Sequence, residues 1–333
     1  MTCTIAIDAM GGDIGPAAIV PAALDFASED MRLILVGPED VLSQHLQAAA
    51  QDRSNWVSIR HAPEQVGMDE PPSQALRQKK NSSMRVAINL VKSGEASACV
   101  SAGNTGALMA TAKFVLKMLP GIDRPAIIAE LPASGGTVHM LDLGANTVSD
   151  AAQLFQFALM GSIVTSDISG IKRPRVALLN VGVEDMKGHE TVREAAAKLN
   201  ESGLNYVGFI EGNEIFSGKA DVVVTDGFTG NVALKTMEGT AAFVSRTFRK
   251  AFTRNLLTRL QALIAGPVLK RVGREMDSRN YNGASLVGLN GIVIKSHGGA
   301  DSYAFQHAIE TALVEVKKQV PEQIGSLLQQ EAA

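Results

Sequence analysis

The stretch VVVTDGFTGNVALKTMEGT (residues 222–240) joins an apolar, β-branched run to a helical pattern through a glycine-rich turn. The run that ends at Asp226 is typical of a strand, and the spacing of apolar residues after Gly230 favours a helix. A tight turn requires one or two glycines, but this turn also carries Thr229, Asn231 and Lys235. These polar groups predict that the strand-to-helix junction faces a ligand.

The same alternation of short apolar runs and amphipathic segments covers most of the 333 residues. It predicts an α/β fold with a mostly parallel sheet and helices on both faces. We expect one continuous fold (1–333) with two lobes around a cleft. The predicted strands are 4–8, 32–37, 56–62, 96–103, 137–144, 175–182, 205–212 and 221–227. The predicted helices are 17–27, 40–51, 84–91, 106–118, 149–164, 190–200 and 230–252.

Glycines and polar residues gather where the predicted strands end. Because the carboxyl ends of parallel strands share one edge of a sheet, we expect these loops to meet there. Glycine turns before helices leave backbone N–H groups free to bind an anion. The predicted phosphate- or substrate-binding residues are Asp8, Gly12, Gly103, Asn104, Thr105, Gly106, Asp142, Asn146, Gly230, Lys235 and His297.

Two lysines and a histidine near these turns remain open to two interpretations. Lys187 precedes Gly188 and a predicted helix, and Lys235 lies one helical turn after Asn231. Either lysine could serve the ligand site or lie solvated on the surface. His297 follows an apolar run and precedes two glycines, so it could be a site donor or a helix-start residue.

Charge and cysteine content exclude several classes of protein. The chain has 31 basic and 34 acidic residues, with a net charge of −3, so no bulk positive charge indicates nucleic acid. Cys3 and Cys99 lie in apolar runs and are interpreted as buried hydrophobic residues in a reducing compartment. The N-terminus resembles no signal peptide, and no apolar run reaches the roughly 18 residues of a membrane span. We therefore expect a cytoplasmic protein.

Known cofactor motifs are missing from the sequence. Neither GxGxxG after the first strand nor GxxxxGK[ST] is present, and no GxSxG marks a serine hydrolase. His189-Glu190 lacks the second histidine of a zinc-binding HExxH motif. We expect no metal and no cofactor.

The segment 246–276 carries eight Lys or Arg residues and a single acid, Glu275. Apolar residues recur every four positions from Val244 to Leu260, and Gly266-Pro267 interrupts the pattern. We predict a protruding helical hairpin over 241–277 with a basic, leucine-rich tip. It favours either a dimer interface at its base or contact with an anionic membrane at its tip. The predicted membrane-contact residues are Leu257, Leu260, Leu263 and Ile264.

Taken together, the motifs resemble those of the bacterial acyl-carrier-protein:phosphate acyltransferases of phospholipid synthesis, the PlsX family. The matching segments span nearly the whole chain in order. They are DAMGGD (8–13), KNSSM (80–84), SAGNTGAL (101–108), RPA (124–126), LDLGAN (141–146), LLNVG (178–182) with Glu184 and Lys187-Gly188, DGFTGNVALK (226–235) and the HG pair (297–298). The sequence HGGAD departs from the family, which more often has a serine after HG.

The resemblance implies a fold like that of isocitrate and isopropylmalate dehydrogenases and of phosphotransacetylases, in a homodimer. It implies transfer of a long-chain acyl group from acyl-acyl carrier protein to inorganic phosphate, without metal or nucleotide. Lys187 and Asn231 match the family's catalytic lysine and asparagine. The resemblance also implies peripheral membrane contact and a downstream glycerol-3-phosphate acyltransferase as partner.

Three other functions remain open at this stage. A phosphotransacetylase would use acyl-coenzyme A in the same chemistry, and a metal- and NAD-dependent hydroxyacid dehydrogenase would share the fold. Asp142, Asp221 and Asp226 do not assemble into the metal cluster that the dehydrogenase requires. A non-catalytic membrane scaffold is the third alternative, and the polar groups at five strand ends argue against it.

Overall fold

The computed structural model describes residues 3–49, 52–184, 186–275 and 277–331. The end of the predicted helix 40–51 and residue 276 of the predicted hairpin lie outside the described residues, as do residues 1–2, 185 and 332–333.

One sheet runs through the described chain in the order β3-β2-β1-β4-β11-β10-β5-β6-β9-β7-β8. Seven of its ten described strand pairings are parallel, which confirms the predicted mostly parallel sheet. The strands are β1 (Cys3–Asp8), β2 (Met31–Gly37), β3 (Val57–His61), β4 (Ala98–Ser101), β5 (Ala126–Ala133), β6 (Gly136–Leu141), β7 (Val176–Leu179), β8 (Tyr206–Ile210), β9 (Val222–Val224), β10 (Ala284–Val287) and β11 (Ile292–Lys295).

The middle of the sheet is antiparallel, which the sequence patterns did not predict. β10 runs against both β11 and β5, and β5 forms a hairpin with β6 through Gly135. Gly135 adopts φ 83°, a backbone conformation that favours glycine. Because of these reversals, β6, β9 and β7 run opposite to β1, β4 and β11. The prediction that all the strand-end loops share one edge of the sheet was therefore wrong.

Helices cover both faces of the sheet, as predicted. α1 and α11 pack on one face of β1 and β4, α4 and α5 on the other, and α6, α7 and α12 on β6 and β9. α3 was not among the predicted helices. The helices are α1 (Pro16–Phe26), α2 (Glu39–Ala49), α3 (Pro72–Gln78), α4 (Ser83–Ser93), α5 (Thr105–Leu116), α6 (Ala151–Ser169), α7 (Glu190–Asn200), α8 (Gly227–Phe252), α9 (Leu256–Ile264), α10 (Gly266–Glu275), α11 (Ser302–Lys318) and α12 (Val320–Glu331).

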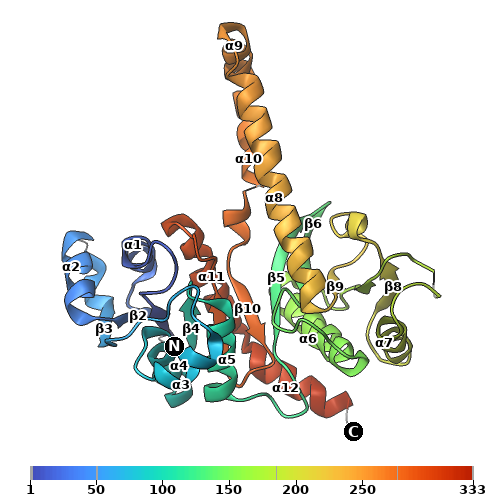
Figure 1. Cartoon of the computed structure of the whole chain (residues 1–333), viewed down its shortest axis with the longest axis horizontal. Helices are drawn as coiled ribbons and strands as arrows, with labels where there is room; N and C mark the ends of the chain where they lie inside the picture. The colour runs from blue at the N-terminus through green and yellow to red at the C-terminus, as the bar shows by residue number, and fades with distance from the viewer. Residues whose placement is uncertain (1–2, 50–51, 185, 276, 332–333) are drawn as a thin grey trace.

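A helical hairpin projects from the body (Figure 1). α8 rises out of the sheet region, α9 forms the far end and α10 returns beside α8. The helix is interrupted at Ala265, between α9 and α10, next to the predicted Gly266-Pro267 interruption. α8 ends before Asn255, and a new helix begins there. The Asn255 Oδ1 accepts the Thr258 N–H at 2.9 Å and so caps the start of α9. The apolar pattern from Val244 to Leu260 is therefore divided between two helices, contrary to the single stripe expected.

The hairpin tip exposes large apolar side chains. Leu256, Leu257, Leu260, Leu263 and Ile264 are all exposed, and Leu263 is 77% accessible. Such a patch on a soluble surface is typical of an interaction site. No described helix is long and apolar enough to cross a bilayer.

Candidate functional site

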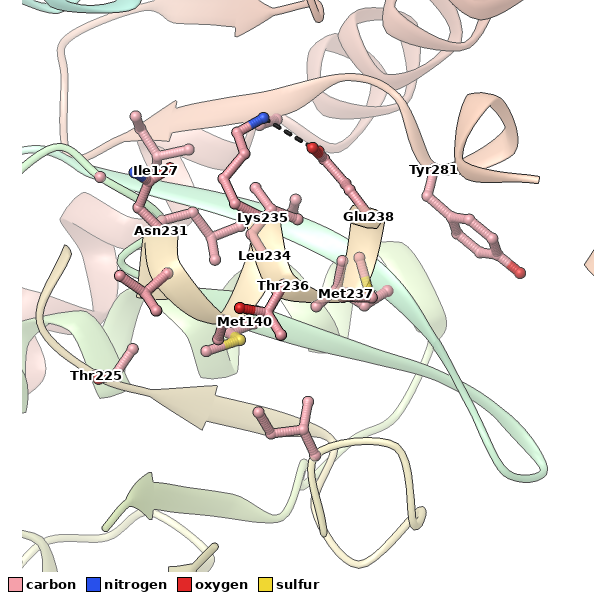
Figure 2. Close-up of a pocket in the computed structure, with 18 of the residues that line it drawn as sticks. Ile127, Met140, Thr225, Asn231, Leu234, Lys235, Thr236, Met237, Glu238 and Tyr281 are labelled. Atoms are coloured by element: carbon pink, nitrogen blue, oxygen red, sulfur yellow. Dashed lines mark hydrogen bonds and ion pairs between the residues drawn. The ribbon is translucent and has the colours of Figure 1, made fainter. Parts of the chain in front are cut away.

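A cleft of about 1830 Å³ surrounds the first turns of α8. Its walls come from the start of α5, the β5–β6 ribbon, the ends of β7 and β11, and the loops after β8 and α10. Figure 2 shows Asn231, Leu234, Lys235 and Met237 of α8 facing this space. Of the residues predicted to bind phosphate or substrate, Thr105, Lys235 and His297 lie in its lining, together with Asn231.

The turn at residues 226–230 holds the start of α8 against the end of β6. Asp226 caps the helix, because its carboxylate accepts both the backbone N–H and the hydroxyl of Thr229, at 2.9 and 2.8 Å. A Cβ on Gly230 would lie 1.9 Å from the carbonyl oxygen of Asp142, so only glycine fits. This close approach places the next residue, Asn231, at the cleft. Asp226 and Thr229 thus have structural roles beside the ligand space, which they also line.

Asn231 presents an uncommitted amide to the cleft. Its side chain is exposed and packs near Gly144, where a Cβ would lie 3.5 Å from the Asn231 Cβ. In the described part of the chain, no group hydrogen-bonds this amide, whereas the amides of Asn104, Asn146 and Asn180 are all engaged. An amide held in place but unpaired is suited to donate to a substrate oxygen.

Asp142 and Asn146 form a buried cluster under the cleft. The Asp142 carboxylate accepts the backbone N–H groups of Ile127, Gly144, Ala145 and Asn146 at 2.7–3.2 Å. The Asn146 amide donates to Asp142 at 2.9 Å and to the Pro125 carbonyl at 2.8 Å. Burial raises the pKa of Asp142, and these hydrogen bonds oppose that change. Both predicted binding residues are thus occupied in holding the loop, and neither contributes to the described cleft surface.

Asp8, Gly12 and Gly103 lie where three loops meet. The Ser101 hydroxyl donates to the buried Asp8 carboxylate at 2.6 Å, and burial raises the pKa of Asp8. A Cβ on Gly12 would lie 2.7 Å from the Gly298 carbonyl oxygen, and one on Gly103 would lie 3.3 Å from Asp8 Oδ2. These residues pack the loops after β1, β4 and β11 against each other. None of them is part of the described cleft lining.

At the start of α5, Asn104 and Gly106 support the fold, whereas Thr105 is exposed to the cleft. Asn104 caps the helix by accepting the Ala107 N–H at 2.9 Å, and its amide donates to the Met68 carbonyl at 2.6 Å. Gly106 packs against Pro72 of α3, where a Cβ would lie 2.7 Å from Cγ. Thr105 alone of these three residues lines the cleft. A helix N-terminus at this point favours an anion.

Lys187 lies at the rim rather than in the described lining of the cleft. Its ammonium pairs with Glu184 at 2.9 Å, and its side chain is 50% exposed. The loop that carries it is anchored to the cleft wall by Asn180, whose amide donates to the Lys187 carbonyl at 3.1 Å. Asn180 Oδ1 also accepts the Val181 N–H at 2.9 Å. A Cβ on Gly188 would lie 1.9 Å from Asn180 Oδ1, so the anchor requires glycine there.

Lys235 and His297 offer donors from two sides. Figure 2 shows Asn231 and Lys235 on one side of α8, with the Lys235 ammonium 2.8 Å from the Glu238 carboxylate. The Gly299 N–H donates to His297 Nδ1 at 3.0 Å, so Nδ1 of the neutral ring is the acceptor. The ring proton is therefore on Nε2, which is a donor.

The sequence patterns missed Lys295, a charged residue at the floor of the cleft. It ends β11 and is only 9% exposed. Burial first, and then Lys235, lower its pKa to about 8, while Asp8 and Asp13 oppose this change. The available signal was a lysine closing an apolar run just before His297-Gly298. In the ranges that the structure describes, no three acidic, cysteine or histidine side chains are grouped to hold a metal ion.

Comparisons with known proteins agree with this geometry. The model of the family described as "Fatty acid synthesis protein" matches residues 3–323. A phosphate acyltransferase of Nitrosococcus oceani is 57% identical over 331 residues, covering 99% of this chain and 97% of the relative. A phosphate acyltransferase of Legionella pneumophila is 54% identical, covering 95% of this chain and 94% of the relative.

Solved structures with low sequence identity share the fold. A phosphotransacetylase from Streptococcus pyogenes superposes with a TM-score of 0.63 at 18% identity, over 95% of this chain and 94% of that one. A branched-chain phosphotransacylase from Enterococcus faecalis gives 0.59 at 17% identity, over 95% and 99%. These likenesses confirm the predicted phosphotransacetylase-like fold. By its match to the family model and to its relatives, the chain belongs to the fatty acid synthesis protein family and is an acyltransferase.

Proposed function

We propose that the protein transfers a long-chain acyl group from the thioester of acyl-acyl carrier protein to inorganic phosphate. The products are acyl phosphate and free acyl carrier protein. Relatives more than half identical over almost the whole chain are named phosphate acyltransferases. The cleft has the two properties that this reaction needs, namely cationic and amide donors and a large apolar surface.

The chemistry requires positioning more than base catalysis. Phosphate is already an anionic nucleophile near neutral pH, so its oxygen can attack the thioester carbonyl carbon once both are held together. The carbon–sulfur bond then breaks, and the thiolate leaves with the carrier protein. The start of α5 at Thr105, the Lys235 ammonium and the His297 Nε2–H are the donors suited to phosphate.

Lys187 and Asn231 are the proposed catalytic residues. The Asn231 amide has no protein partner in the described chain, so it can donate to the oxyanion that develops on the carbonyl oxygen. Among the described residues, the Lys187 ammonium forms one half-exposed pair, with Glu184, so it can exchange that partner for the oxyanion or the departing thiolate.

Apolar side chains that line the cleft beside α8 can bind the acyl chain. Phe216 after β8 and Val232 of α8 line the same cleft as Asn231, and both side chains are exposed. Burying methylene groups there stabilises a long chain by about 0.8 kcal/mol for each CH₂. An acetyl group could not use this surface.

The observation that carries the proposal is the joining of the unpaired Asn231 amide, the Lys235 and His297 donors and this apolar surface in one cleft. The test is to incubate the pure protein with long-chain acyl-acyl carrier protein, with and without phosphate. Acyl phosphate, trapped by hydroxylamine and identified by mass, is expected only with phosphate. A thioester that survives unchanged in phosphate would refute the reaction.

The solved structures suggest acyl-coenzyme A as the second candidate donor, because phosphotransacetylases share the fold. The exposed basic residues of the hairpin favour the carrier protein, which is acidic as a class. A side-by-side comparison of kcat/KM for the two donors with the same acyl group separates them. A higher kcat/KM for acyl-coenzyme A would favour the coenzyme.

We further propose that the protein is a cytoplasmic homodimer that contacts an anionic membrane peripherally. The exposed apolar side chains along α8, including Phe243 and Phe248, suit packing of the hairpin base against a second protomer. The leucines and arginines near the tip suit a lipid surface. Release of acyl phosphate there would serve a downstream glycerol-3-phosphate acyltransferase.

A further inference from the structure

Lys295 differs from the other lysines of the site in its degree of burial. Its side chain is almost fully enclosed, whereas those of Lys187 and Lys235 are 50% and 53% exposed. It ends β11 beside Ser101 of β4 and forms part of the cleft floor. Removing an ammonium from water is costly unless the protein or a ligand compensates it. A lysine at this position therefore requires an explanation.

The protein compensates Lys295 only in part. Its ammonium donates to the carbonyl oxygens of Ala102, at 3.3 Å, and of Ser296. Two carbonyls take two of the three N–H bonds of an ammonium. No carboxylate of the described chain forms an ion pair with Lys295, and the nearby Lys235 adds like charge. The Asp8 and Asp13 carboxylates act on it from a distance as the opposing charges.

Two lysines that repel each other across a cleft form a site for an anion. Lys235 approaches from α8, and its present partner is the side chain of Glu238. His297 lies two residues after Lys295, and its Nε2–H is the free donor of the ring. A dianion between these groups would remove the repulsion and use the third N–H of Lys295.

We propose that Lys295 is a phosphate ligand that, together with Lys235 and His297, holds the attacking inorganic phosphate at the cleft floor. This inference rests on the proposed function, because phosphate is the nucleophile of that reaction. The burial of Lys295 keeps competing water away from one face of the anion, which strengthens the contact. Lys295 thus determines affinity for phosphate rather than for the acyl donor.

Steady-state kinetics test this inference with the two substrates varied separately. Lys295→Met should raise KM for phosphate about 10- to 100-fold, the range expected for one lost charged hydrogen bond. KM for acyl-acyl carrier protein should change less than threefold. Lys295→Arg should recover part of the phosphate affinity. Lys92→Met, an exposed lysine of α4 away from the cleft, is the matched control. An unchanged KM for phosphate in Lys295→Met overturns the inference.

Direct binding on the wild-type protein covers the case in which Lys295→Met does not fold. Phosphate affinity, measured by calorimetry, should fall about tenfold for each pH unit above pH 8, as the ammonium loses its proton. Lys295→Arg should keep its affinity to pH 9.5. Asp8, Asp13, Lys235 and His297 are the other titratable groups facing Lys295. Wild-type affinity that stays constant from pH 7 to 9.5 overturns the inference.

These outcomes separate the inference from the proposed function. If the wild-type protein forms no acyl phosphate, the proposed reaction fails. If it forms acyl phosphate while Lys295→Met keeps its normal KM for phosphate, only the role of Lys295 fails.

Discussion

Around the cleft, the polar side chains that follow the strands are hydrogen-bonded to other loops, whereas the apolar side chains of the hairpin tip lie in solvent. Asp142 alone binds four backbone N–H groups, while Leu263 is 77% exposed. Most of these polar groups therefore have their partners within the described chain, whereas the Asn231 amide has none there. The leucines of the hairpin tip, in contrast, remain exposed.

Because of this difference, substitutions in the cleft loops and on the hairpin tip should have different effects. Substitutions in the hydrogen-bonded loops act on folding as well as on chemistry, because each side chain supports several backbone groups. We expect substitutions on the hairpin tip to leave the fold intact, since these exposed side chains lie away from the body, and to act on the proposed membrane contact.

The largest effect is expected at the hairpin tip. Changing Leu257, Leu260 and Leu263 together to Gln should lower affinity for anionic phospholipid vesicles by about 10³-fold or more, because each buried leucine contributes about 1.5–3 kcal/mol. Sedimentation with vesicles measures this. Acyl phosphate formation without vesicles should stay normal. Val148→Gln, an exposed apolar residue of the body, is the control and should bind normally. Unchanged vesicle binding by the triple variant would show that the tip is not the anchor.

Lys187→Ala should lower kcat about 10²- to 10³-fold, the usual loss for one donor to an oxyanion. Folding should be unaffected, because the pair with Glu184 is half-exposed and such pairs contribute little stability. Turnover of acyl-acyl carrier protein and a thermal melt measure the two quantities. Glu184→Gln is the control and should retain far more activity. Near-normal turnover in Lys187→Ala would remove this residue from the mechanism.

Asp142→Ala should lower the free energy of unfolding by about 3–5 kcal/mol, because it leaves several buried N–H groups without an acceptor. Urea denaturation measures the loss. Asp226→Ala removes a helix cap and should cost about 1 kcal/mol, which makes it the matched comparison. A smaller loss for Asp142→Ala than for Asp226→Ala would show that the buried cluster does not support the loop.

The smallest effect is expected between β5, α6 and α11, where Glu315 of α11 lines a cavity of about 190 Å³. Burial raises the pKa of Glu315 from 4.5 to about 7, against a hydrogen bond from the Ser285 hydroxyl at 3.0 Å. The neutral carboxyl thus contributes stability that is fully present below pH 4.5 and is lost as the pH rises through 7.

This contribution amounts to about 3 kcal/mol across that range. Urea denaturation of the wild type and of Glu315→Gln at pH 5 and pH 8 measures it. The stability difference between the two proteins should move in favour of Glu315→Gln at pH 8. Parallel stability curves over this range would contradict the shift.

Much of the fold could be read from local patterns. The apolar runs that became β1, β2, β6 and β9, and the helix pattern that became α8, are regular over several residues, so periodicity alone identifies them. The sequence patterns did not predict β5 and β10, although both lie in the middle of the sheet. β5 pairs with β6, and β10 with β11, through short glycine-containing turns, so these two reversals are local. The pairing of β5 with β10 joins segments distant in sequence, and no local pattern shows it.

The candidate site, like the fold, was predicted only in part from the sequence. The glycine turns and the cluster after Asp226 are sequence signals, and Asn231, Lys235 and His297 do line one cleft. Asp142, Asn146 and Asn104 carry the same residue types at the same kind of turn, yet their polar groups are engaged by the backbone. Residue type and spacing do not distinguish a group that holds a loop from one that is left free.

The sequence by itself determined the α/β class, the family and the polar turn that starts α8, because these depend on short-range patterns and motifs. Only the tertiary structure decided that the sheet reverses in its middle, so that loops from both of its edges reach the cleft along α8. It also decided that Lys295 is buried at the floor of that cleft. Burial and hydrogen-bond partners arise from segments brought together in space, and the order of residues does not reveal them.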